Sequence, residues 1–365
     1  MRASRECPKW FPMQDDLVHS TVSPWPHRWA LVLACATFPL VWVGGLVTTT
    51  DAGMAVPDWP STYGHNLFLY PWKTWLFGPW DLFVEHGHRL LGAAVGLLTI
   101  LLLVALWRCD QRRWVRQLGI VALLLVVAQG VLGGMRVLLD ERLLAMLHGC
   151  TGPLFFAVTV SLVVVTSQGW RGTGASACEI LKTTSRKFDH RLLHQLGTVR
   201  ALVVLTCLLV FVQLGLGAML RHMPVGAEPS TFAAAAQFHV GLAVVLALDV
   251  GALSWLVVVY LRRVPLLRNL GFLLALLTTI QLGLGVGTWA VKYSVAQWAS
   301  NIPWLASYTI EAGSWLQTHV ITAHVAVGSL MLATSVALVL YTLRWVPTAH
   351  PRNIPQAVGA LEVAL

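Results

Sequence analysis

Charged side chains are scarce in this 365-residue sequence. Asp, Glu, Lys and Arg make up 11% of the residues, whereas apolar residues make up 56%. Typical soluble domains contain about 25% charged residues. A disordered chain needs low hydrophobicity and a collagen needs a strict glycine period, so the composition excludes both. The composition predicts a polytopic membrane protein.

Cysteine is also sparse, and no two cysteines are placed to act together. None forms a CxxC motif or shares a connection between apolar runs with another, and the six are Cys7, Cys35, Cys109, Cys150, Cys178 and Cys207. This spacing argues against a zinc site or a disulfide framework. The first 29 residues lack an uninterrupted apolar run. We therefore expect no cleavable signal peptide and expect the first span to act as a signal anchor.

Long apolar runs are what the sequence has in abundance. A membrane helix needs about 20 largely apolar residues. The segments that meet this requirement are 30–50, 84–107, 118–138, 143–167, 199–220, 232–261, 266–291 and 314–343. The sequence thus predicts an all-α polytopic membrane protein with eight transmembrane helices.

Basic residues gather in every second connection between these spans. The net charge of +9 would suggest nucleic-acid binding in a soluble protein, but the positive-inside rule explains this alternation without a nucleic-acid partner. Both ends of the chain belong to the basic set. Both termini are therefore predicted to be cytoplasmic, with the protein in the cell inner (plasma) membrane. The outward connections 51–83 and 292–313 are rich in tryptophan, which prefers the headgroup layer, and are predicted to form a lid.

The longest cytoplasmic connection divides the spans four and four. A Gln-x-x-Leu-Gly pattern begins at Gln129, Gln213 and Gln281, which suggests a duplication into two pseudo-symmetric four-helix bundles. Its glycines are interpreted as helix-packing residues. The predicted domains are a cytoplasmic segment (1–29), an N-terminal bundle (30–167), a cytoplasmic linker (168–198), a C-terminal bundle (199–343) and a cytoplasmic tail (344–365).

Every even-numbered span carries one histidine at a depth that is common to within about one helical turn. These residues are His88, His148, His239 and His324. The residue four positions later lies on the same helix face and is always Gly or Ala, which predicts a clearing beside each imidazole. A porphyrin held by a histidine from each side needs such a clearing. A lone histidine is more often hydrogen-bonded to a neighbouring helix, but four matched ones favour heme ligation.

Other residues near these histidines have less specific interpretations. Zinc is disfavoured as the metal because no HExxH motif or suitably spaced cysteine is present. His319 is a substitute candidate for the fourth ligand. Glu85 lies on the same face as the first histidine and would either stabilise positive charge, relay protons or simply face water. Arg89, Arg136 and Arg221 would bind heme propionates or snorkel to headgroups.

These residues together resemble a known family. The run Glu85-His-Gly-His88-Arg89, the outer run from Thr48 to Trp59 and the histidine in each even-numbered span resemble the heme A synthase family over residues 30–345. The resemblance implies a membrane oxidoreductase that oxidises the C8 methyl group of heme O to a formyl group by successive hydroxylation, for cytochrome oxidase biogenesis.

The resemblance also implies which residues do the work. Substrate heme O would bind between His88 and His148, and a heme B cofactor between His239 and His324. Glu85 matches the family's essential glutamate near the reacting edge, and the arginine that follows the first histidine is expected to contact the cofactor. The implied partners are heme O, membrane lipid, a membrane electron donor or acceptor and a heme O synthase. Homo-oligomerisation is left open.

One departure and two alternatives accompany the resemblance. Many members of the family carry a cysteine pair in an outer loop, which this sequence lacks, so the lid is expected to take over its structural part. A di-heme electron carrier of the cytochrome b561 type also explains paired histidines, although its hemes usually lie at different depths. A non-catalytic heme-binding or transport subunit is the third alternative.

Overall fold

The chain folds almost entirely into helices that are long enough to cross a membrane. The computed structural model describes residues 23–172, 190–224, 226–261, 264–293 and 310–346. Eight helices in these ranges have the length and apolar composition of membrane spans. The prediction of an all-α polytopic membrane protein with eight such helices is confirmed. The β structure of the same ranges is one isolated bridge, between Thr62 and His65.

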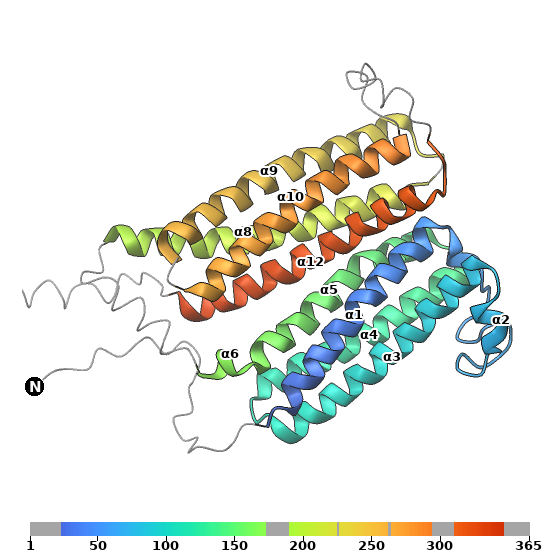
Figure 1. Ribbon diagram of the computed structural model, residues 1–365, viewed down its shortest axis with the longest axis horizontal. Coiled ribbons are helices and arrows are strands. Elements are labelled where there is room, and N and C mark those ends of the chain that lie inside the picture. The colour runs from blue at the N-terminus through green and yellow to red at the C-terminus, as the bar shows by residue number, and fades with distance from the viewer. Residues whose placement is uncertain (1–22, 173–189, 225, 262–263, 294–309, 347–365) are drawn as a thin grey trace, which may run out of the picture.

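The first four long helices form one group and the last four another (Figure 1). The first group consists of α1 (Trp25–Thr49), α3 (Trp80–Cys109), α4 (Arg113–Leu139) and α5 (Arg142–Thr166), followed by the short α6 (Gln168–Gly172). The second consists of α8 (His190–Arg221), α9 (Pro229–Leu261), α10 (Pro265–Tyr293) and α12 (Trp315–Trp345). In each group, consecutive helices pack together and the fourth packs against the first. Both groups are therefore four-helix bundles, as a duplication would give.

Four helices form the interface between the two bundles. α12 packs against both α1 and α5, and α5 also contacts α8. In the most apolar part of α5 and α12, 56% of the residues are buried, against 33% or fewer in the other spans. The other helices present most of their apolar surface outward, which suits lipid as the surrounding solvent.

The helices extend beyond the predicted apolar segments. α1 begins at Trp25 rather than residue 30, and α8 begins at His190, within the predicted linker. α9 has 33 residues and is thus about 50 Å long, well beyond the hydrocarbon layer of about 30 Å. Hydropathy detects only the apolar centre, whereas the backbone hydrogen bonds continue through the polar flanks.

Proline and hydroxyl side chains mark the helix ends. Pro229 and Pro265 are the first residues of α9 and α10, where a missing N–H costs nothing and the fixed φ suits the first turn. Ser314 caps α12 by accepting a hydrogen bond from the Gln317 N–H.

The two ends of the bundles are named here by what they carry. We call the end that carries residues 50–79 the loop end, and the end near Asp110, at the α3–α4 connection, the basic end.

Candidate functional site

Two pairs of histidines face each other, one pair in each bundle. The rings of His88 (α3) and His148 (α5) have centroids 6.3 Å apart and planes at 85°. The rings of His239 (α9) and His324 (α12) also have centroids 6.3 Å apart, with planes at 72°. The four histidines selected in the sequence thus lie together in twos, and their role as iron ligands stays a prediction.

The spacing of each pair fits one metal ion between two imidazoles. A metal–nitrogen bond of about 2 Å, plus ~1.1 Å from that nitrogen to the ring centre, places two ring centroids about 6 Å apart across one metal. Within the described ranges, no group of three or more His, Cys, Asp or Glu residues could hold a metal ion. Zinc takes three or four protein ligands, whereas heme iron needs only axial ones. The pairs therefore fit heme better than zinc.

A glycine of the preceding long helix lies against each histidine ring. A Cβ atom on Gly44, Gly133, Gly217 or Gly285 would lie 2.9, 3.2, 3.2 and 3.3 Å, respectively, from the Cε1 atom of the facing histidine. A larger residue at any of these positions would displace the ring. These glycines therefore position the histidines, beyond the helix packing that the sequence suggested.

Glutamines of the same repeated pattern fix the backbone beside the histidines. Gln213 and Gln281 each donate from Nε2 to the backbone carbonyl of the facing histidine, at 2.9 and 3.0 Å. In the first bundle the Gln129 carbonyl oxygen lies 3.2 Å from Nδ1 of His148. Sequence reasoning missed this role. The signal that could have found it is the recurrence of the pattern one long helix before three of the histidines.

The small residues four positions after the histidines do not all leave open space. A Cβ on Gly92 would meet nothing within 4 Å, and one on Gly152 would make only an ordinary contact at 3.7 Å. A Cβ on Gly328 would meet Leu214 at 3.1 Å and Gln281 at 3.3 Å, because α8 and α10 both pack against α12. The predicted clearing is therefore wrong at Gly328.

His319 is directed to its own helix rather than to the second pair. Its ring stacks on Trp315, with centroids 4.1 Å apart, and its Nδ1 atom lies 2.8 Å from the Trp315 carbonyl oxygen. The structure pairs His239 with His324 instead. The substitute ligand considered for the fourth position is thus not brought to the pair.

Glu85 is buried and held from two sides. Its Oε2 atom accepts a hydrogen bond from the Val56 N–H at 2.8 Å, and its Oε1 atom pairs with Arg89 at 2.9 Å. The residue is only 2% exposed, so the interpretation of a carboxylate that faces water is wrong. Arg89 also donates to the carbonyl oxygens of Val56, Asp58 and Ser61. Glu85 and Arg89 together tie the loop to α3.

The loop 50–79 is also folded on itself and against α4. It contains the short helices η1 (Ala52–Met54) and α2 (Trp72–Leu76). Asp58 accepts hydrogen bonds from the N–H groups of Tyr63 and Gly64 at 2.7 and 2.9 Å. Partial burial raises the pKa of the Asp58 carboxyl, but these hydrogen bonds hold that pKa below its ordinary value. The Trp59 ring lies directly against Gly134 of α4, next to Gly133, the glycine that faces His148. The second predicted lid, 292–313, lies mostly outside the described residues.

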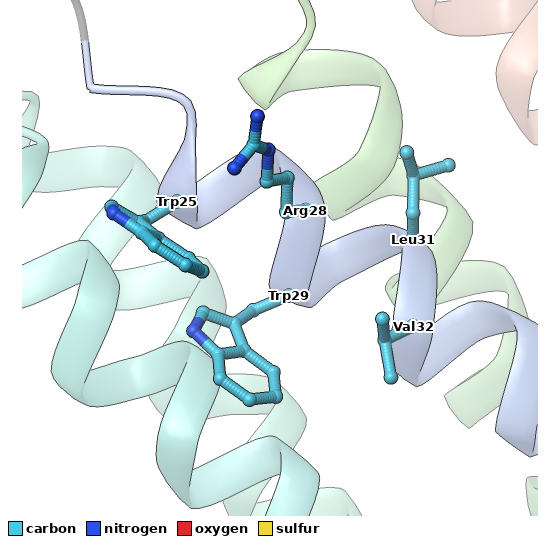
Figure 2. A pocket seen from close by; sticks show the side chains of 5 residues that line it. All are labelled: Trp25, Arg28, Trp29, Leu31 and Val32. Carbon is cyan, nitrogen blue, oxygen red and sulfur yellow. The ribbon is translucent and has the colours of Figure 1, made fainter.

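A shallow pocket of about 420 Å³ lies elsewhere, on the first turns of α1 (Figure 2). It is lined by Trp25, Arg28, Trp29, Leu31 and Val32. These residues lie at the basic end of α1, whereas the glycine that faces the first histidine pair lies near its loop end. The pocket is therefore separate from both pairs.

Part of the chain is similar to known proteins. Residues 79–237 match the family model described as COX15-CtaA, cytochrome oxidase assembly protein. Curated heme A synthases from Shouchella clausii (strain KSM-K16) and Lysinibacillus sphaericus (strain C3-41) are 32% and 31% identical to the chain over 122 and 143 residues. These stretches are 33% and 38% of this chain, and the chain spans only 38% and 44% of the length of these relatives. No solved structure matches the chain.

The matched segment contains much of the candidate site. It runs from the start of α3 into the first turns of α9, and so includes Glu85, Arg89 and the first histidine pair, but ends just before His239. Over this segment, which is less than half of the chain, the protein is similar to the COX15-CtaA family of cytochrome oxidase assembly proteins.

Proposed function

We propose that this protein is a heme A synthase, which oxidises the C8 methyl group of heme O to a formyl group. His88 and His148 hold the substrate heme O, and His239 and His324 hold a heme B cofactor. The bound hemes supply the redox chemistry, with a membrane electron donor or acceptor and a heme O synthase as partners. The protein lies in the inner membrane with both termini cytoplasmic and the loop end outward.

The observation that carries this proposal is a pair of matched sites with one difference. Both histidine pairs have ring centroids 6.3 Å apart, but within the described ranges only the first has a buried carboxylate one turn away, Glu85. The positions three residues before the second pair hold Ala236 and Ile321. A substrate site and a cofactor site should differ in this way. The substrate site needs a charged side chain beside the reacting group, whereas the cofactor site does not.

The residues around the first pair fix charge and exclude water. Arg89 and the Val56 N–H hold the Glu85 carboxylate in one position, so its negative charge can stabilise positive charge that develops at the substrate without any rearrangement. Glu85 is buried and bonded to the loop, and the exclusion of water strengthens the electrostatic interactions of its carboxylate.

The relative position of the pairs argues against a transmembrane electron carrier. Gly44 of α1 contacts His88, and the next residue, Gly45, contacts Thr322, two residues before His324. The two pairs therefore lie at one level of the bundles. A carrier of the b561 type would place its hemes near opposite membrane surfaces.

Pigment analysis tests the proposal. The protein, co-expressed with a source of heme O, should contain heme B and heme O or heme A, measured as pyridine hemochromes and by mass spectrometry. Replacement of His88 or His148 by Ala should remove the substrate heme, and replacement of His239 or His324 should remove heme B. His319→Ala is the control and should change neither. A protein that holds only heme B and makes no heme A would be an electron carrier.

A further inference from the structure

Arg221, at the loop end of α8, reaches from one bundle into the other. Its Nη2 group donates to the Gly45 carbonyl oxygen at 2.9 Å and to the Thr49 hydroxyl at 2.6 Å, both on α1. Its Nη1 group is buried and has no hydrogen-bond partner among the described residues. The ion pairs of the described ranges also leave Arg221 without a carboxylate.

The guanidinium lies close to the second histidine pair. Arg221 follows Gly217, the glycine that lies against His239, by one helical turn. Thr49, which accepts its hydrogen bond, also lies 3.3 Å from the hydroxyl of Thr322, two residues before His324.

The acceptors that the buried Arg221 guanidinium reaches are a carbonyl oxygen and a hydroxyl, which are neutral. Its positive charge therefore lacks a counter-ion among the described residues. Arginine remains charged and carries five N–H donors, and a buried charge without a counter-ion is costly, most of all at the edge of a membrane. An arginine that snorkelled to headgroups would expose its Nη groups, but Nη1 is buried. The missing partner is thus an anion that enters the bundle from the histidine side, and a tetrapyrrole carries carboxylates on its rim.

We propose that Arg221 binds a carboxylate of the tetrapyrrole held by His239 and His324. Nη1 donates to the carboxylate, and Nη2 keeps its hydrogen bonds to α1. The inference rests on the second heme site of the proposed function and adds the residue that fixes the rotation of that heme about the axis between its two ligands.

Porphyrins with and without carboxylates test this assignment. The apo form of a His88→Ala variant, which retains only the second pair, is titrated with heme B and with its dimethyl ester, and binding is followed by the Soret band. A charge-assisted hydrogen bond should make the free acid bind about tenfold more tightly or better. Arg221→Gln should abolish this preference and leave the affinity for the ester unchanged, while Arg221→Lys should keep part of it.

Two control variants separate carboxylate binding from the packing of the bundles. Arg142→Gln removes another arginine of the loop end, one that is exposed and bonds to the Met223 carbonyl oxygen, and should keep the full preference. Thr49→Val removes the hydroxyl that accepts from Arg221 and lies beside the Thr322 hydroxyl, and it should also keep the preference.

Three results would overturn the inference. They are an Arg221→Gln variant with the wild-type preference, equal binding of acid and ester by the parent, or loss of preference in Thr49→Val as large as in Arg221→Gln. A parent that binds neither porphyrin would remove the proposed function itself, and this inference with it.

Discussion

At the scale of single residues, one carboxylate distinguishes two otherwise similar histidine pairs. Glu85 accepts one hydrogen bond from the loop and one from Arg89, so it both carries a charge and anchors a segment. A substitution that removes both properties cannot tell them apart. Glutamine keeps an acceptor for the Val56 N–H, which holds the loop, and removes the charge together with the acceptor for Arg89.

Glu85→Gln should therefore impair the reaction while leaving the loop in place. We expect both hemes to bind, by their absorbance spectra, and heme A formation to fall by about 10²-fold or more, as when a charge-stabilising group is lost from an active site. Glu85→Ala should in addition make the loop more sensitive to proteolysis. Glu141→Gln, at an exposed position of the same end, is the control. Normal heme A formation by Glu85→Gln would remove the catalytic role of the charge.

The glycines that face the histidines allow a similar test of position. Gly44→Ala places a Cβ 2.9 Å from Cε1 of His88, a distance at which the ring or α1 must shift. We expect weaker heme binding at the first pair, seen as loss of about half of the absorbance of the two-heme protein, and an unchanged second pair. Gly96→Ala on α3, where a Cβ meets nothing within 4 Å, should be neutral. Equal effects of the two substitutions would contradict the contact.

At this scale the sequence predicted the candidate histidine ligands but not the glycines that position their rings. Histidines inside apolar segments stand out, because burying them in lipid is costly. Gly44, Gly133, Gly217 and Gly285 do not stand out, because glycine is common in membrane helices. Their meaning depends on which helix faces which, and a single sequence does not contain that information.

At the scale of helices, the α3–α4 connection is held by a cluster of charges. Asp110 is 2% exposed and pairs with Arg112 at 2.7 Å and Arg171 at 2.6 Å. Arg112 also donates to the Val165 carbonyl oxygen at 2.9 Å. The cluster thus joins α3, α4, α5 and α6 at the basic end. In the sequence, the basic residues of this connection were interpreted only as signals of membrane topology.

Asp110→Asn should therefore destabilise the first bundle. Loss of the carboxylate leaves two arginines without their counter-ion, and breaking such a buried cluster should lower the free energy of unfolding by about 3 kcal/mol. The measurement is the thermal midpoint in detergent. The matched control is Asp140→Asn, at an exposed position in the left-handed region that Asn also adopts readily. Equal midpoints for the two variants would show that the cluster contributes little.

At the scale of the whole molecule, contacts at both ends hold the bundles together, besides the central helices and the hydrogen bonds of Arg221 to α1. At the basic end, Trp170 of α6 packs on Tyr341 of α12 with centroids 5.8 Å apart, and the Arg344 guanidinium lies 4.6 Å from the Trp170 ring centroid. At the loop end, Arg142 of α5 donates to the Met223 carbonyl oxygen at 3.2 Å. Periodicity and charge predicted four helices on each side, but these contacts join segments far apart in the sequence and gave no signal there.

The loop-end contact also contains His222, which makes the stability of the whole molecule depend on pH. Burial, together with the positive charges of Arg221, Arg136 and Arg142, lowers the pKa of His222 to about 4. The unfolded chain binds this proton below its ordinary pKa of 6.5, whereas the folded protein does not until about pH 4. The contribution to stability is therefore fully present above pH 6.5 and is lost as the pH falls from 6.5 toward 4.

Wild-type protein should lose about 2 kcal/mol of stability over that interval through this residue, a value reduced from the full shift because the ring is partly accessible to solvent. His222→Gln has no proton to take up and should have a flatter dependence of thermal midpoint on pH between 7 and 4.5. His65→Gln, in the exposed part of the loop 50–79, should follow the wild type. The comparison with His65→Gln separates the effect of His222 from the loss of any one histidine. If the thermal midpoints of wild type and His222→Gln depended on pH in the same way, His222 would make no pH-dependent contribution to stability.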